Sequence, residues 1–115
     1  MSKRKSLIFT VAILVIIFMI LSMKWKYDIE RVFDVNKWEQ RVEDRHKMIE
    51  SLIHQYGIIG MSKHEIKALL GSNAMYQDND EVLSYFIAYG MGDPVIFEIR
   101  FDEVGKAIGY SKYES

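Results

Sequence analysis

The longest apolar run in the chain is the feature that most constrains its fold. It extends from Leu7 to Met23, contains no charged residue, and has polar side chains only at Thr10 and Ser22. These 17 residues would form a helix roughly 25 Å long, close to the lower limit for crossing a bilayer. A chain of 115 residues is too small to surround a helix that is apolar on every side. The run therefore predicts a membrane-spanning helix.

Residues at the two ends of the run predict how it lies in the membrane. Lys3, Arg4 and Lys5 precede it, and basic residues beside a first membrane span are retained in the cytoplasm. Trp25 and Tyr27 follow it, and such rings favour the membrane interface. No spaced small residues mark a cleavage site, which favours an uncleaved anchor over a removed signal peptide. We expect a single-pass cell-membrane protein with a basic cytoplasmic terminus at residues 1–6, a transmembrane signal anchor at 7–25, a juxtamembrane stalk at 26–36 and an extracytoplasmic domain at 37–115.

The charges of the chain divide between these parts. The formal net charge is −1, but the residues before Tyr27 carry +5 and the remainder carries −6. An acidic domain gives no indication of nucleic-acid binding and would be repelled by anionic lipid. The chain has no cysteine, which excludes disulfides, thiolate metal sites, thiol nucleophiles and a lipidated cysteine. Its length allows one domain beyond the anchor.

Helical periodicity predicts a first domain helix over residues 37–56. Asn36 offers an N-cap with the acid Glu39 three residues later, and Gly57 ends the pattern. A wider gap in the apolar pattern falls at Arg45 and His46. The apolar residues otherwise recur at steps of three and four, as in a helix with one buried face. They are Trp38, Val42, Met48, Ile49, Leu52, Ile53 and Tyr56.

Terminal signals predict a second, shorter helix. Ser62 and Glu65 have the spacing of a capping box, and Met61 and Ile66 have that of a hydrophobic staple. Gly71 stands where the chain must leave the helix with positive φ, which costs other residues about 1 kcal/mol or more. We therefore expect a helix that begins after Ser62 and ends before Gly71.

Alternating apolar residues predict a sheet after a polar loop at residues 72–80. The expected strands are residues 81–89, 95–101 and 106–113. Turns at residues 90–94 and 102–105 would join them, and Ile108 and Tyr110 would lie on the inner face of the third strand. The fold class is therefore α+β, with a transmembrane helix and then two helices packed on one face of a three-stranded antiparallel meander.

Two sequence blocks resemble a known family. GMSxxEIxxLLG at residues 60–71 and FDExGK at 101–106, with a tyrosine-rich strand between them, resemble the SmpA/OmlA-like domain. That family includes the BamE lipoproteins of outer-membrane assembly, and its fold is similar to a repeat of the β-lactamase inhibitor protein. Small bacterial membrane-anchored proteins of unknown function resemble residues 38–113 more closely, with an arginine and a methionine placed like Arg45 and Met48. The residues of the shared structural motif are Gly60, Met61, Ser62, Glu65 and Gly71.

The resemblance implies a binding role, because characterised relatives hold or inhibit other proteins. Two departures limit what it implies. Family members usually have proline two residues after the helix-ending glycine, where this chain has Asn73. Outer-membrane members are anchored through a lipidated cysteine, which this chain lacks. We therefore expect no role in outer-membrane assembly.

No pattern in the sequence predicts catalysis. His46, His54 and His64 lack the spacing of metal ligands, and residues 78–81 lack the later glycine and glutamate of a calcium loop. Residues 90–93 are too short for a phosphate loop and precede a strand rather than a helix. We expect no catalytic, cofactor-binding or metal residue and no enzymatic activity.

Tyrosines in the sheet region are the candidates for contact with a partner. Tyrosine is favoured at interfaces because its ring adds contact area at low entropic cost, although it is also a good, half-buried strand residue. We expect a membrane-tethered, extracytoplasmic protein-binding module of the bacterial cell envelope, with an unknown envelope or secreted protein as its partner and the bilayer contacted through residues 7–25. The alternative is an immunity or inhibitor protein that neutralises a secreted enzyme or toxin. The candidate contact residues are Tyr85, Tyr89, Tyr110 and Tyr113.

Overall fold

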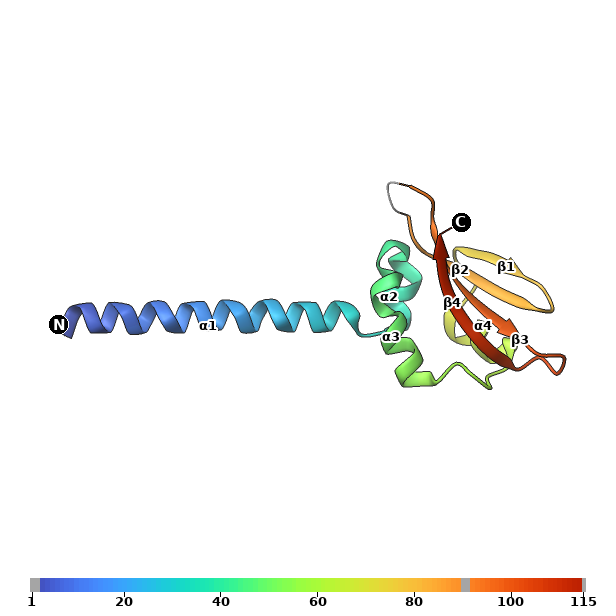
Figure 1. Cartoon of the computed structure of the whole chain (residues 1–115), viewed down its shortest axis with the longest axis horizontal. Coiled ribbons are helices and arrows are strands. Elements are labelled where there is room, and N and C mark those ends of the chain that lie inside the picture. The colour runs from blue at the N-terminus through green and yellow to red at the C-terminus, as the bar shows by residue number, and fades with distance from the viewer. Residues whose placement is uncertain (1–2, 90–91, 115) are drawn as a thin grey trace. The chain divides into compact units, whose positions relative to one another are not determined.

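The chain contains two compact units. The computed structural model describes residues 3–89 and 92–114, apart from the side chain of Tyr27. One unit ends at Glu30 and the other begins at Arg31. Figure 1 shows a single long helix in the first unit and several helices with an antiparallel sheet in the second.

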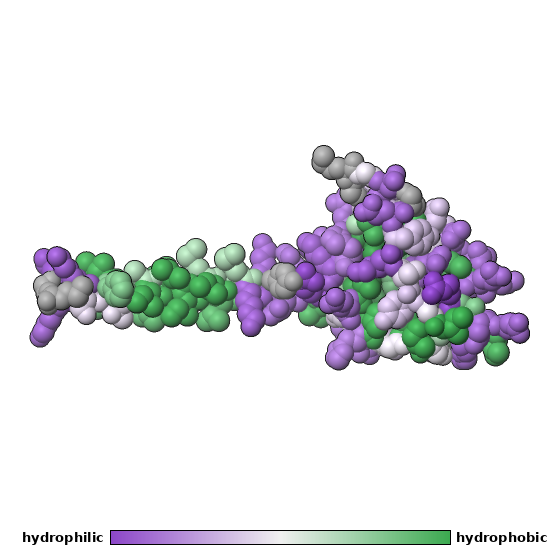
Figure 2. Space-filling view, in the orientation of Figure 1, coloured by the Kyte–Doolittle hydropathy of each residue, from purple (hydrophilic) through white to green (hydrophobic). Residues whose placement is uncertain are grey.

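The first unit contains the helix α1 (Lys3–Arg31), whose last residue is the first of the second unit. Its apolar side chains are exposed, and they form the hydrophobic band between charged ends in Figure 2. The Thr10 hydroxyl donates to the carbonyl of Ser6 at 2.9 Å, so this polar group is satisfied within the helix. The helix is long and apolar enough to cross a membrane, as the sequence predicted. The helix also includes residues 26–31 of the expected stalk at 26–36.

The second unit begins earlier than the expected boundary at residue 37. Phe33 is only 4% exposed, and its ring contacts those of Trp38 and Tyr56. Its N–H donates to Ser51 Oγ at 2.8 Å. Phe33, assigned to the stalk from the sequence, is therefore part of the domain core.

The helix predicted over residues 37–56 is broken. Its residues form three elements, α2 (Val35–Gln40), the 3₁₀ helix η1 (Val42–Asp44) and α3 (Arg45–Tyr56). Asp34 caps α2 by accepting from Lys37 N at 3.0 Å, so the expected cap at Asn36 is wrong. The backbone of Arg41 leaves the helical region, with φ −125° and ψ 74°. Gly57 ends α3 in the left-handed conformation, which confirms that prediction.

The next helix, α4 (Lys63–Leu70), begins and ends as predicted. Ser62 Oγ accepts from Glu65 N at 3.1 Å, and the Glu65 carboxylate reaches back to the Ser62 N–H. Gly71 follows the helix with a φ of 75°. Ile66 is buried and Met61 packs against the core, as a staple requires.

The sheet has four antiparallel strands in the order β1-β2-β3-β4, where the sequence predicted three. The additional strand β1 lies in the expected polar loop and pairs with β2. The strands are β1 (Met75–Asp78), β2 (Val82–Ala88), β3 (Val95–Phe101) and β4 (Ala107–Glu114). The predicted turn at residues 90–94 falls partly outside the described residues.

The start of β4 corrects the prediction for Ile108. The register between β3 and β4 shifts there, because Arg100 pairs with Gly109 whereas Phe101 pairs with Ala107. Ala107 takes the inner position and is buried, while Ile108 is 59% exposed. A bulge of this kind redirects a side chain away from the face that strict alternation assigns to it.

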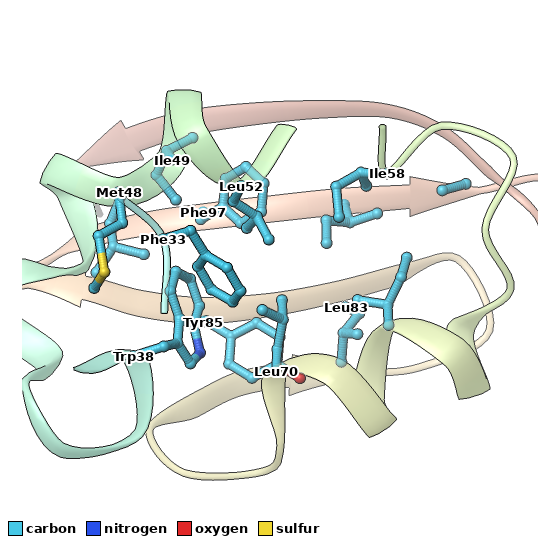
Figure 3. Packing of buried hydrophobic residues seen from close by; sticks show 14 of the residues in the cluster. Phe33, Trp38, Met48, Ile49, Leu52, Ile58, Leu70, Leu83, Tyr85 and Phe97 are labelled. Carbon is cyan, nitrogen blue, oxygen red and sulfur yellow. The ribbon is translucent and has the colours of Figure 1, made fainter. Parts of the chain in front are cut away.

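The core fills the space between the helices and one face of the sheet (Figure 3). Side chains from α3 and α4, such as Leu52 and Leu70, meet those from the strands, such as Leu83 and Phe97. Trp38 and Tyr85 lie together near the centre, with ring centroids 5.9 Å apart. The helices thus cover one face, which is called the inner face below. The opposite face is called the outer face.

Candidate functional site

A row of large side chains crosses the outer face of the sheet. Phe86 of β2 lies opposite Ile96 of β3, which in turn lies opposite Tyr113 of β4. The ring of Tyr76 in β1 meets that of Phe86, with centroids 5.2 Å apart. We call these four residues, one from each strand, the aromatic row. Alternation along β2, β3 and β4 puts Phe86, Ile96 and Tyr113 on the face away from the helices, because adjacent residues such as Tyr85 and Phe97 face the core. Tyr76 lies at a bulge in β1, and its contact with Phe86 places it on the same face.

The aromatic row is a compact surface rather than a loose set of rings. Ile96 is fully buried although it does not belong to the main core cluster, because its neighbours in the row flank it on both sides. Tyr76 is 46% exposed, and Tyr89, whose ring lies 5.6 Å from that of Phe86, is 49% exposed. Exposed aromatic rings packed over a fixed apolar centre are typical of protein interfaces.

Polar residues border the aromatic row. Ser84 and Ser111 lie on the two sides of Glu98 in the neighbouring row. Arg100 extends over Gly109 and approaches the Glu98 carboxylate at 3.7 Å. Partial burial, with the Glu98 carboxylate nearby, raises the pKa of the Tyr113 phenol. Tyr113 therefore presents a neutral hydroxyl that can donate a hydrogen bond at the edge of the row.

Two of the four tyrosines expected to contact a partner belong to this surface. Tyr113 is in the aromatic row and Tyr89 lies beside it. Tyr110 lies opposite Ile99, which is an inner residue, and its ring contacts that of Phe97 at 6.0 Å between centroids. Tyr110 therefore lies on the other face from the row.

The fourth candidate, Tyr85, is a core residue. It is fully buried, and its hydroxyl donates to the carbonyl of Gly71 at 2.6 Å. Burial raises its pKa to about 12. Tyr85 cannot contact a partner in this structure, which corrects the expectation. Phe86, which was not among the predicted contact residues, takes part instead. Adjacent strand residues face opposite sides of a sheet, so one of Tyr85 and Phe86 had to be outside, but the sequence does not show which.

Arg45 is the other notable polar group of the domain. Its side chain is fully buried, and its Nε donates to the Trp38 carbonyl at 2.7 Å. Its Nη1 donates to the carbonyls of Asn73 and Phe86, both at 3.1 Å. Burial lowers its pKa, and the negative charge of Glu39 opposes that effect. Because every partner is a backbone carbonyl, Arg45 acts as a structural tie rather than a reactive group.

The histidines and carboxylates of the described residues do not gather into a metal site. Among residues 3–89 and 92–114, no group of three or more His, Asp or Glu side chains is placed to hold a metal ion. His46, His54 and His64 are all exposed. A hollow of about 760 Å³ lies between η1, the start of α3 and the sheet, with Ile87 and Val95 in its lining. His46 lines the same hollow together with Glu43 and Asp44, and no hydrogen bond among these three side chains is described.

Comparison of the chain with models of protein families, with curated proteins and with solved structures gave no match. The resemblance of residues 60–71 and 101–106 to the SmpA/OmlA-like domain therefore stays a prediction.

Proposed function

We propose that this protein is a membrane-tethered, extracytoplasmic module of the cell envelope that binds another protein through the aromatic row. The observation that carries the proposal is the row itself, in which Phe86 and Tyr113 flank the buried Ile96 on the outer face of the sheet, and the Tyr76 ring packs against that of Phe86. Aromatic side chains in such a fixed arrangement lose little entropy on binding.

The proposed position of the module is supported by α1. The helix has the length and hydropathy of a membrane span, and basic residues precede its apolar part. By the positive-inside rule these residues stay in the cytoplasm, so the acidic domain lies outside it. A reporter enzyme fused after Ser115 should be active only outside the cytoplasm. Activity inside would contradict the orientation.

Photocrosslinking in intact cells tests the binding role. A photoreactive phenylalanine derivative replaces Tyr76 or Tyr113 in the full chain, one position at a time. We expect both positions to capture the same protein, because both rings lie in one row. A probe at Glu50, which is exposed on α3, serves as the control and should not capture that protein. Capture of nothing from the row, or equal capture from Glu50, would contradict the proposal.

The identity of the captured protein separates the two binding hypotheses. A resident envelope protein supports a tethering or assembly role, whereas a secreted enzyme or toxin supports the inhibitor or immunity role. In either case, replacing Phe86 by Ser should strongly reduce capture through a probe at Tyr76, because the two rings are in contact.

A further inference from the structure

A second exposed apolar surface lies at the hairpin between β3 and β4, away from the aromatic row. Val104 in the turn is 82% exposed, and Ile108 is 59% exposed because of the bulge at the start of β4. Together with Val82 and Phe101 they line a hollow of about 850 Å³. We call this hollow the hairpin site. Large aliphatic side chains gathered around a hollow are more typical of an interaction surface than scattered single residues.

Acidic side chains form the rim of the hairpin site. The carboxylates of Asp80, Glu81 and Glu103 line it and make no hydrogen bond or ion pair with any residue that the structure describes. Asp102 also lines the site, but its carboxylate is engaged, because Oδ1 accepts from Val104 N and Lys106 N, both at 2.9 Å. Three carboxylates at the rim are therefore available to a partner.

The two basic side chains of the hairpin site are directed elsewhere. Lys63 forms an ion pair with Asp78 and donates to the carbonyl of Asn79 at 2.8 Å. Arg100 extends along the sheet over Gly109 toward Glu98. Neither neutralises the rim carboxylates, so the apolar hollow keeps an unbalanced negative border. A partner without basic groups would displace water from these carboxylates and provide no opposite charge in its place. Its binding would therefore be weakened.

We propose that the hairpin site binds a segment of a partner protein in which an apolar side chain is flanked by lysine or arginine. The apolar side chain would enter the hollow against Val104 and Ile108, and its basic neighbours would pair with the rim. This charge complementarity would also accelerate association and exclude acidic partners. The proposal is independent of which protein occupies the aromatic row.

The test uses the full chain in nanodiscs of phosphatidylcholine, which is zwitterionic, and the synthetic peptide GKRLFRKG as the probe. Binding is followed by the NMR shifts of the methyl groups of Val104 and Ile108. We expect saturable shifts that weaken with added salt, and much weaker binding of the uncharged peptide GQNLFNQG. The double variant Glu81→Gln and Glu103→Gln should raise the Kd for GKRLFRKG about tenfold.

A matched variant tests whether the site, rather than the net charge of the domain, is responsible. Glu50→Gln combined with Glu114→Gln removes the same charge at exposed positions outside the hairpin site, and we expect its Kd to stay within about twofold of wild type. Replacing Val104 and Ile108 by Ser should weaken binding as much as the rim variant. The proposal is overturned if both charge variants weaken binding equally, if the two peptides bind equally, or if no shift occurs. It is also overturned if calcium ions alone produce the same shifts and displace the peptide.

Discussion

Arg45 connects three segments that lie far apart in the sequence. Its guanidinium donates to the carbonyls of Trp38, Asn73 and Phe86, which belong to α2, the loop before β1 and strand β2. The same group lies 4.6 Å from the centroid of the Trp38 ring. A planar cation with several fixed donors suits this position, whereas an ammonium group makes fewer directed bonds.

Replacing Arg45 should therefore destabilise the domain strongly. In Arg45→Met the three carbonyls lose their donor inside the core, and we expect a loss of about 3 kcal/mol in the free energy of unfolding. Arg45→Lys keeps the charge but loses the planar set of N–H donors, so it should also be destabilising. Urea unfolding of the full chain in detergent, followed by Trp38 fluorescence in a Trp25→Phe background, measures both.

The matched control for Arg45 is Arg41→Met, because Arg41 is exposed and no contact of its side chain is described. This change should alter the free energy of unfolding by no more than about 0.5 kcal/mol. Equal stability of Arg45→Met and wild type would show that Arg45 does not tie the segments together.

At the scale of single residues, the sequence predicted contacts between residues close together in the chain and missed those that depend on tertiary packing. The capping box of Ser62 and Glu65 was predicted because both partners lie within one helical turn. Tyr85 and Phe86 are adjacent and similar in composition, yet one is in the core and the other on the outer face. Their assignment needs the sheet register and the side on which the helices pack, and neither is encoded by the residue type.

At the scale of elements, α4 and β1 are connected by a small charge cluster. Lys63 and Lys67 of α4 both bond to the Asp78 carboxylate at the end of β1, the latter at 2.7 Å. β1 has only four residues, carries a bulge and is rich in polar side chains, so alternation did not reveal it. Its existence depends on pairing with β2 and on contacts with α4 rather than on a pattern of its own.

The connection through Asp78 predicts a dependence of stability on pH. Hydrogen bonds from Lys63 and Lys67 lower the pKa of Asp78 below its ordinary value of 3.8. A carboxyl group with a lowered pKa in the folded state stabilises the fold above its unfolded pKa, and this contribution is lost as pH falls through the folded pKa. Wild type should therefore melt at a higher temperature than Asp78→Asn at about pH 7. The difference between the two melting temperatures should shrink below about pH 3.

The control for this measurement is Asp80→Asn, which removes a nearby exposed carboxylate that has no described partner. Because solvent screens exposed pairs, we expect a difference of only a few degrees for Asp78→Asn and almost none for Asp80→Asn. A difference for Asp78→Asn that is the same at both pH values would contradict a role for its charge.

At the scale of the whole molecule, the near-neutral net charge conceals two units with different properties. The apolar helix α1 carries the basic residues near the N-terminus and a further pair close to the end of the apolar run. The domain is acidic, and its core is built around residues from α2, α3, α4 and the sheet. Hydropathy predicted this division but placed the start of the domain too late, because the helical spacing of Ile29, Val32 and Phe33 fits a continuation of α1 as well as a first element of the domain.

The position of Phe33 in the core gives a test of where the domain begins. A fragment that starts at Arg31 keeps Phe33 and the Asp34 cap, and we expect it to fold with dispersed NMR signals. A fragment that starts at Lys37 lacks both, and it should be largely unfolded or molten. Loss of a buried phenylalanine side chain lowers the free energy of unfolding by about 3 to 5 kcal/mol. Domains of this size are only marginally stable, so a loss of that size should unfold most of the fragment.

Point variants of the full chain distinguish the loss of Phe33 from an effect of fragment length. Phe33→Ala should lower the free energy of unfolding by about 3 kcal/mol, because the ring contacts Trp38 and Tyr56. Val35→Ala is the control, since Val35 is 46% exposed and its truncation leaves no cavity. If both variants match wild type and the shorter fragment folds, Phe33 only rests on the surface of the domain. If Phe33→Ala alone is destabilised, the segment between α1 and α2 is part of the folded domain.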